Sequence, residues 1–226
     1  LPLQDFVQLY SGPDSYNRRQ IYRSADQQSW TQAMSLSPDQ SEEFEIFLRP
    51  ERTPLSPGLY YLRLNTGNQN IYAGPYLLAV SNIQVMMKLS ANQAFIWAVA
   101  LDSGQPLAQA PVRILGPQGE LLAEGQTDAQ GISQVSIPTL EDPYSTVYAV
   151  IGEPGQPDFG ISLSGWSQGV APWDFNLAVD YLGSRLKGYL YTDRPIYRPG
   201  DQVNFRAIVR QASNGRYTLP DLGSLP

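Results

Sequence analysis

A proline-glycine pair at Pro199-Gly200 constrains the fold of this chain more than any other local feature. Proline fixes φ for the second position of a type II turn, and glycine accepts the positive φ of the third position, so the chain reverses direction there. From 203 to 209, apolar residues stand at every second position, which is the period of an antiparallel strand with one buried face. The tyrosine- and leucine-rich run 186–191 predicts a strand before the turn.

The residues around this turn resemble a known signature. From 191 to 203 the chain reads Tyr-Thr-Asp-Arg-Pro-Ile-Tyr-Arg-Pro-Gly-Asp-Gln-Val. This run resembles the sequence with which macroglobulin-like domains of the α2-macroglobulin superfamily commonly open. The matching residues are Tyr191, Thr192, Asp193, Arg194, Pro195, Tyr197, Arg198, Pro199, Gly200 and Val203. The resemblance implies a row of macroglobulin-like β-sandwiches.

The charged members of the signature have two interpretations. We expect Asp193, Arg194 and Arg198 to pair with one another and hold the loop in shape. The alternative is direct contact with a protease.

The composition predicts an all-β protein. Charged residues make up only 16% of the chain, while 19 Gly, 19 Pro and 14 Tyr are typical of many short strands joined by turns. At 226 residues the chain can form two or three antiparallel sandwiches, since each needs roughly 80 to 110 residues. The predicted class is therefore tandem antiparallel sandwiches of the Ig-like or fibronectin-like type.

The absence of cysteine and histidine excludes much of enzyme chemistry. With Cys 0 and His 0, the chain has no thiol nucleophile, disulfide or histidine base, and we predict neither a cofactor nor a metal, and no enzymatic activity.

The net charge of −6, without a basic run, argues against nucleic acid or an anionic bilayer as a partner. No segment approaches the roughly 20 apolar residues of a membrane span. Since residues 1–4 resemble no leader sequence, we expect a removed signal or an internal fragment.

Turn signals divide the chain into four predicted parts. These are a first macroglobulin-like sandwich at 1–80, a second at 81–172, a linker at 173–184, and the truncated start of a third domain at 185–226. The last part is about half as long as a sandwich needs, so we expect a piece of a longer protein with an open sheet edge.

Hydrophobic alternation predicts the strands of the first two units. In the first, strands are expected at 6–10, 21–22, 44–48, 59–64 and 71–80, with a short helix at 26–33. In the second, seven are expected, at 83–89, 95–101, 112–115, 120–126, 133–137, 146–151 and 159–163. The run 95–101 is apolar on both faces, which predicts a central strand covered on each side.

The segment 104–137 resembles a strand pair of bacterial macroglobulin-like domains, and also carboxypeptidase-regulatory-like and adhesin Ig-like repeats. Within it, Asp128 can cap its own turn, and Gly131 can take a positive φ. A calcium site at Asp128 is the alternative, but no further carboxylates stand at ligand spacing.

Three aromatic residues mark the end of the second unit and the predicted linker. Trp166, Trp173 and Phe175 lie in a stretch rich in glycine and proline. We expect these rings to wedge between neighbouring domains and set their angle, because each buries a large apolar area. A sugar-stacking platform is the alternative.

Two functions remain open at this point. The resemblance implies a structural part of a bacterial protease-trapping inhibitor, whose partners are target proteases, bound through the full-length parent, and neighbouring macroglobulin-like domains. Such proteins act in the periplasm, at the cell envelope or after secretion. Many capture prey through a Cys-x-x-Gln thioester, which this cysteine-free chain lacks. The alternative is a tandem Ig-like adhesion or glycan-binding module of a cell-surface protein.

Overall fold

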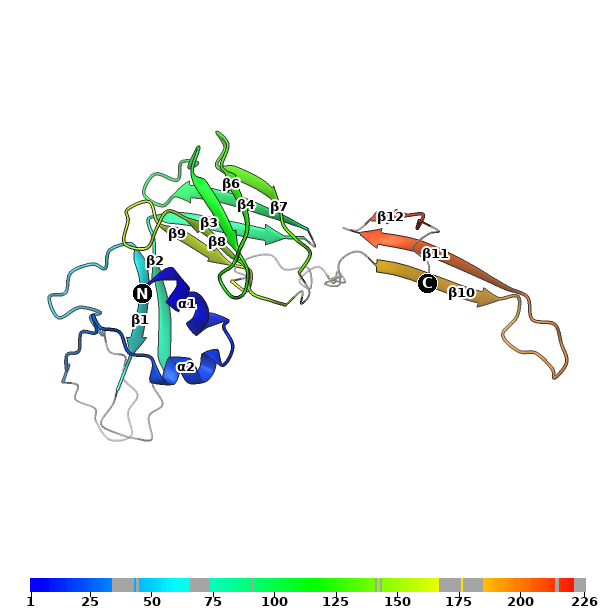
Figure 1. Ribbon diagram of the computed structural model, residues 1–226, viewed down its shortest axis with the longest axis horizontal. Coiled ribbons are helices and arrows are strands. Elements are labelled where there is room, and N and C mark those ends of the chain that lie inside the picture. Colours follow the sequence, from blue (N-terminus) through cyan, green and yellow to red (C-terminus); the bar gives the residue numbers. More distant parts are fainter. Residues whose placement is uncertain are drawn as a thin grey trace.

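The structure is a computed structural model that describes residues 1–33, 43, 45–65, 74–90, 92–140, 142, 144–166, 176, 185–213 and 216–221. Its elements are shown in Figure 1. In chain order they are α1 (Leu3–Tyr10), α2 (Ser15–Ile21), β1 (Gly58–Arg63), β2 (Pro75–Val80), β3 (Ile83–Leu89), β4 (Gln93–Ala100), β5 (Pro111–Leu115), β6 (Leu121–Gln126), β7 (Ile132–Ser136), β8 (Tyr148–Ile151), β9 (Gly160–Leu163), β10 (Arg185–Thr192), β11 (Phe205–Ser213) and β12 (Arg216–Thr218). Every strand pair is antiparallel.

Strands β3 to β9 form a two-sheet sandwich. One sheet has the order β3-β4-β7 and the other β6-β5-β8-β9. Small and branched apolar side chains from both sheets fill the space between them, among them Val85, Ile96, Ile114 and Ala149. The seven strands predicted for this unit are therefore confirmed, and so is the all-β, Ig-like fold class.

The strands covered on both faces are β8 and β9 and not, as the sequence predicts, β4. All four residues of β8 are buried, because Ala149 and Ile151 face the sandwich core while Tyr148 and Val150 face a second core. In β4, burial alternates, and Phe95 and Trp97 are 37% and 38% exposed on the outer face. β4 is the central strand of its sheet, as predicted, but the expected cover on both faces was wrong, because apolar composition alone does not say which face another element covers.

The segment predicted as a strand at 6–10 is part of helix α1. A five-residue window cannot separate the two periods, whereas the longer spacing Leu3, Phe6, Val7 and Tyr10 is helical. The rings of Phe6 and Tyr10, four residues apart, stack with centroids 6.0 Å apart. The strand prediction was therefore wrong, and the N-terminus is an amphipathic helix.

Other predictions for the first 80 residues also need correction. The predicted strand at 21–22 is the end of α2, where Ile21 is 74% exposed. Residues 26–33 are not helical, and 45–48 are not a strand, while Phe44 lies outside the described residues. The strand at 59–64 is confirmed as β1, and β2 occupies the end of 71–80. The two form a hairpin in which Leu59 pairs with Ala79.

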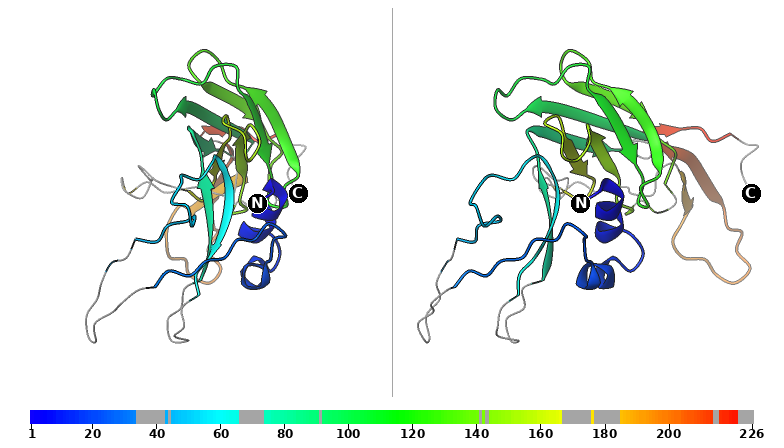
Figure 2. Two further views of the ribbon diagram at one scale, coloured as in Figure 1. Left: turned by 90° about the vertical axis from the view of Figure 1, so that its left-hand side faces the viewer. Right: turned by 60° about the vertical axis from the view of Figure 1, so that its left-hand side comes forward.

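The N-terminal helix and this hairpin pack on the outer face of the sheet β6-β5-β8-β9. Phe6, Val7 and Leu59 join Tyr148 and Phe159 in a second apolar core, distinct from the one inside the sandwich. In Figure 2 the helices (blue) lie beside the hairpin β1–β2 (cyan). The described part of 1–80 thus consists of two helices, with the hairpin β1–β2 packed on the sandwich. The domain limits at 80, 172 and 184 stay predictions.

Strands β10, β11 and β12 form a separate three-stranded sheet in that order. The predicted strand 186–191 is confirmed as β10, and the strand after the turn begins at Phe205, so Val203 lies in the connecting loop. Among the described residues, no helix is long and apolar enough to cross a membrane.

Candidate functional site

The loop between β10 and β11, residues 193–204, carries most of the sequence signature and is hereafter the signature loop. Gly200 has φ +92°, and the amide of Asp201 donates to the carbonyl of Arg198 at 3.0 Å. The predicted turn at Pro199-Gly200 is therefore confirmed. The Asp201 carboxylate also accepts a hydrogen bond from the Arg198 amide at 3.0 Å, which closes the turn a second time.

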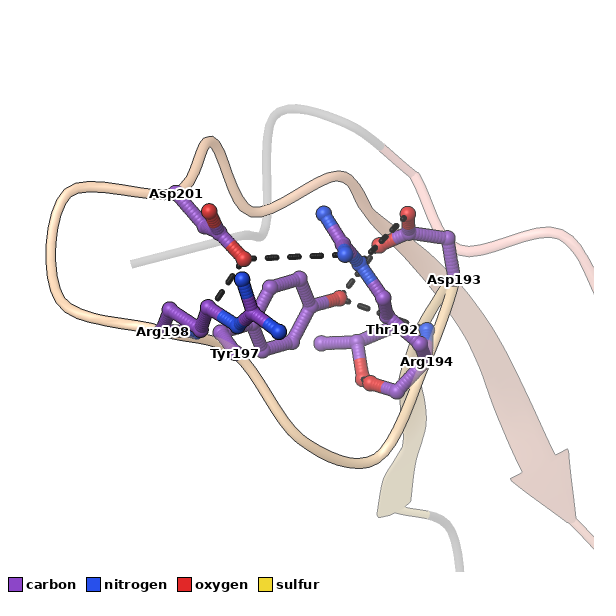
Figure 3. A network of polar contacts seen from close by, with 6 residues as sticks. All are labelled: Thr192, Asp193, Arg194, Tyr197, Arg198 and Asp201. Atoms are coloured by element: carbon purple, nitrogen blue, oxygen red, sulfur yellow. Dashed lines mark hydrogen bonds and ion pairs between the residues drawn. The ribbon is translucent and has the colours of Figure 1, made fainter.

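Tyr197 lies at the centre of the signature loop (Figure 3). Its hydroxyl donates to the Asp193 carboxylate and accepts a longer hydrogen bond, 3.3 Å, from the amide of Arg194. The Arg194 guanidinium lies 4.9 Å from the centroid of the Tyr197 ring, within cation–π range. One aromatic side chain thus joins the first part of the loop to the residues before the turn.

Arg194 links both ends of the loop by charge. Its guanidinium lies 3.6 Å from the Asp201 carboxylate and 3.8 Å from that of Asp193. Thr192, at the end of β10, donates from Oγ1 to the Arg194 carbonyl at 2.8 Å. Because solvent screens these exposed charges, the ion pairs add little stability, and the network acts mainly by fixing the loop's shape.

The pairing expected of the charged signature residues is found for two of the three. Asp193 and Arg194 interact with each other, whereas Arg198 takes part through its backbone amide. The hydrogen bond from Tyr197 holds the pKa of the Asp193 carboxyl below its ordinary value. The alternative interpretation, direct contact of these residues with a protease, stays a prediction.

The three predicted interdomain aromatics are only partly described. Trp166 follows β9, is 43% exposed, and donates its backbone amide to the Leu163 carbonyl at 3.0 Å. Trp173 and Phe175 lie outside the described residues. Both the wedge and the sugar platform therefore stay predictions.

Asp128 has the turn-capping role predicted for it. Its Oδ1 accepts hydrogen bonds from the amides of Gln130 and Ile132, both at 2.9 Å, and Gly131 has φ +75°. A side chain at Gly131 would also meet the Ala98 carbonyl oxygen at 2.4 Å. Among the described residues, no group of three or more acidic, histidine or cysteine side chains could hold a metal.

The contact between α1 and β8 is a structural feature that the sequence reasoning missed. The hydroxyls of Ser11 and Tyr148 lie 2.6 Å apart, and Ser11 Oγ also donates to the Pro117 carbonyl at 3.0 Å. Burial raises the pKa of Tyr148 to about 12. The helical spacing of Leu3, Phe6, Val7 and Tyr10 was the available signal, but no local pattern names the sheet that receives these residues.

Together, the antiparallel sandwich and the signature loop define the class of macroglobulin-domain proteins. The family model "Bacterial alpha-2-macroglobulin MG3 domain" matches residues 80–181, and the model "MG2 domain" matches 187–221. The chain belongs to the bacterial alpha-2-macroglobulin-like proteins.

The curated relatives of the chain are named alpha-2-macroglobulin or alpha-2-macroglobulin homolog. The chain is 29% identical to an alpha-2-macroglobulin of Ralstonia nicotianae over 76% of its own length and 10% of the relative's. It is 24% identical to an alpha-2-macroglobulin homolog of Yersinia pestis, over 60% of this chain and 7% of that protein. An alpha-2-macroglobulin of Escherichia coli is 26% identical over 69% of this chain and 9% of its own length. The chain thus spans about a tenth of these relatives.

Two crystal structures of native alpha-2-macroglobulin from Escherichia coli also match. One spans domains NIE-MG1, is 21% identical and covers 47% of this chain and 49% of that one, with a TM-score of 0.38. The other spans MG0-NIE-MG1, is 23% identical and covers 50% of this chain and 34% of that one, also with a TM-score of 0.38.

Proposed function

We propose that this chain is a structural part of a broad-spectrum protease-trapping inhibitor that protects the bacterial cell envelope. The observation that carries the proposal is the consecutive match of two macroglobulin-domain models, at 80–181 and 187–221. The relatives named alpha-2-macroglobulin support it. In this proposal the parent protein works in the periplasm, at the envelope or after secretion, and its targets are proteases.

The part assigned to this chain is mechanical. The central sheet β6-β5-β8-β9 is covered on one face by the sheet β3-β4-β7 and on the other by α1 and the hairpin β1–β2. A sheet buried on both faces resists bending, because any deformation would open one of two close-packed cores. Such a body can transmit a movement that begins with cleavage elsewhere in the parent.

The chain needs no catalytic group for this role. With Cys 0 it cannot form a Cys-x-x-Gln thioester, so covalent capture of a protease would be carried by another part of the parent. The signature loop, closed on itself by Tyr197 and Arg194, serves in this proposal to join two strands at a set geometry.

The test uses the full-length parent mixed with a protease, such as trypsin, that cleaves both large and small substrates. A trap encloses the protease without blocking its active site, so we expect cleavage of a large protein substrate to fall while cleavage of a small peptide substrate is retained. Equal inhibition of both substrates would show an ordinary active-site inhibitor and contradict the proposal.

A variant pair connects the trap to this chain. Phe6→Ala in the parent removes a fully buried ring that holds α1 to the sandwich, whereas Ile21→Ala changes a side chain that is 74% exposed. We expect weaker trapping for Phe6→Ala only, at a temperature where circular dichroism shows both variants folded. Unchanged trapping in the folded Phe6→Ala parent would argue against a mechanical role for this part.

A glycan-binding module is the second candidate, favoured by the exposed ring of Trp166. Indole faces can stack on the apolar faces of sugar rings. Binding of the chain to a glycan array, abolished by Trp166→Ala, would favour this function over the trap.

A further inference from the structure

The sheet β10-β11-β12 has an unusual charge composition for this chain. Its strands contain Arg185, Lys187, Arg206, Arg210 and Arg216, which are five of the chain's 15 Lys and Arg. None of the 21 Asp and Glu lies in these strands. A chain of net charge −6 therefore holds one sheet without a carboxylate in its strands.

Strand pairing collects several of these cations with tyrosines on one face. In the antiparallel register Lys187 pairs with Arg210 and Tyr191 with Arg206, and residues two apart on a strand share a face. The Tyr189 and Tyr191 rings lie 5.7 Å apart, and the Lys187 ammonium lies 5.7 Å from the Tyr217 ring, as this arrangement requires. The residues that form this basic-tyrosine face are Lys187, Tyr189, Tyr191, Arg206, Arg210 and Tyr217.

The two arginines on this face have no counter-charge within the described part of the chain. No ion pair joins Arg206 or Arg210 to a carboxylate among the described residues, and both side chains are exposed. Arg210 also stands directly across the strand pair from Lys187. The exposed guanidinium groups of Arg206 and Arg210 can therefore bind an external carboxylate.

We propose that the basic-tyrosine face is a docking surface for a protein segment rich in Asp and Glu. The guanidinium fork matches a carboxylate in two parallel hydrogen bonds. Tyr189 and Tyr217, 65% and 61% exposed, offer flat apolar area beside those cations. Tyrosine and arginine are the residues that protein interfaces favour, and this combination distinguishes a protein partner from a bare polyanion. The docking surface does not depend on the proposed protease trap.

The test measures binding of the whole chain to a fluorescein-labelled peptide of alternating glutamate, tyrosine and serine, by fluorescence anisotropy. The variant Arg206→Gln/Arg210→Gln removes two cations from the face. Its matched control, Arg18→Gln/Lys88→Gln, removes two exposed cations from other elements, so both variants have the same net charge. The same peptide with glutamine for glutamate measures the contribution of the carboxylates.

We expect the face variant to weaken binding about five- to thirtyfold and the control variant to change it less than about twofold, since two ion pairs are lost only in the first. Raising the salt from about 50 to about 300 mM should weaken binding to the wild-type chain and have less effect on the face variant. The glutamine peptide should bind no better than background. Equal weakening by both variants, or tighter binding to dextran sulfate or to vesicles containing phosphatidylglycerol than to the peptide, would overturn the proposal.

Discussion

The hydroxyl oxygens of Ser11 and Tyr148 lie 2.6 Å apart although 137 residues separate them in the chain. Ser11 follows helix α1, and Tyr148 is the first residue of β8, fully buried. Because Ser11 donates its one hydroxyl proton to the Pro117 carbonyl, the Tyr148 hydroxyl is the donor between them. The pair therefore joins the N-terminal segment to the centre of the sheet.

Ser11→Ala should cost more than Tyr148→Phe. The first leaves a buried phenol hydroxyl without a partner, at about 1 to 3 kcal/mol, while the second removes that hydroxyl and leaves Ser11 bonded to Pro117, at about 0.5 to 1.5 kcal/mol. Urea unfolding of both variants and of the double variant measures the difference. If Ser11→Ala were neutral, the tyrosine hydroxyl would not depend on this contact.

Phe6→Ala should reduce the free energy of unfolding by about 3 to 5 kcal/mol, because it empties a ring-sized volume in the second core. Phe6 is fully buried beside Tyr148 and Phe159. Ile21→Ala is the control, expected within about 0.5 kcal/mol because the side chain is exposed. Thermal unfolding followed by circular dichroism compares them, and similar melting temperatures would contradict the packing of α1 on the sheet.

Gly200→Val should destabilise the hairpin of β10 and β11 by about 1 to 3 kcal/mol through the forced positive φ. No atom lies within 4 Å of the position that a Cβ at Gly200 would occupy, so backbone strain and not crowding is the cause. Gly188→Val, in open space within β10 and without a left-handed φ, should be neutral or slightly stabilising. Hydrogen exchange of the β10 and β11 amides reports the difference.

An asparagine at position 200 further separates backbone strain from crowding as the cause of the destabilisation. Gly200→Asn should cost less than Gly200→Val, since asparagine tolerates positive φ better than a branched residue does. Equal costs for both substitutions would indicate a cause other than the backbone.

Tyr197→Phe should raise the pKa of Asp193 toward its ordinary value by removing the hydroxyl that donates to the carboxylate. Because the folded pKa lies below the ordinary value of 3.8, this contact stabilises the loop above that pH and is lost as the pH falls through the folded pKa. Carbon-13 NMR titration of the Asp193 carboxyl in both proteins measures the shift. An unchanged pKa in Tyr197→Phe would assign the depression to the backbone amides instead.

Local pattern was sufficient where neighbours in sequence decide the conformation. The turn at Gly200, the cap at Asp128 and the seven strands from β3 to β9 follow from turn chemistry and alternation over a few residues. The same window failed at Phe6, where five residues fit both a strand and a helix, and at Phe95, where an apolar side chain stays half-exposed.

In the candidate site, too, contacts between sequence neighbours could be predicted, whereas long-range contacts could not. The sequence places Asp193, Arg194 and Tyr197 in one short loop, so their mutual contacts follow from proximity along the chain. The packing of Phe6 near Tyr148 could not be predicted, because long-range burial depends on which surface remains uncovered when the sheets form.

The sequence by itself determined the all-β class, the Pro-Gly reversal and the macroglobulin signature, because each depends on residue types a few positions apart. The tertiary structure alone decided that β8, and not β4, is buried on both faces. It also placed Lys187 opposite Arg210 on one face, although the sequence contains no basic run. The physical reason is that strand pairing and packing bring together residues that no local window contains.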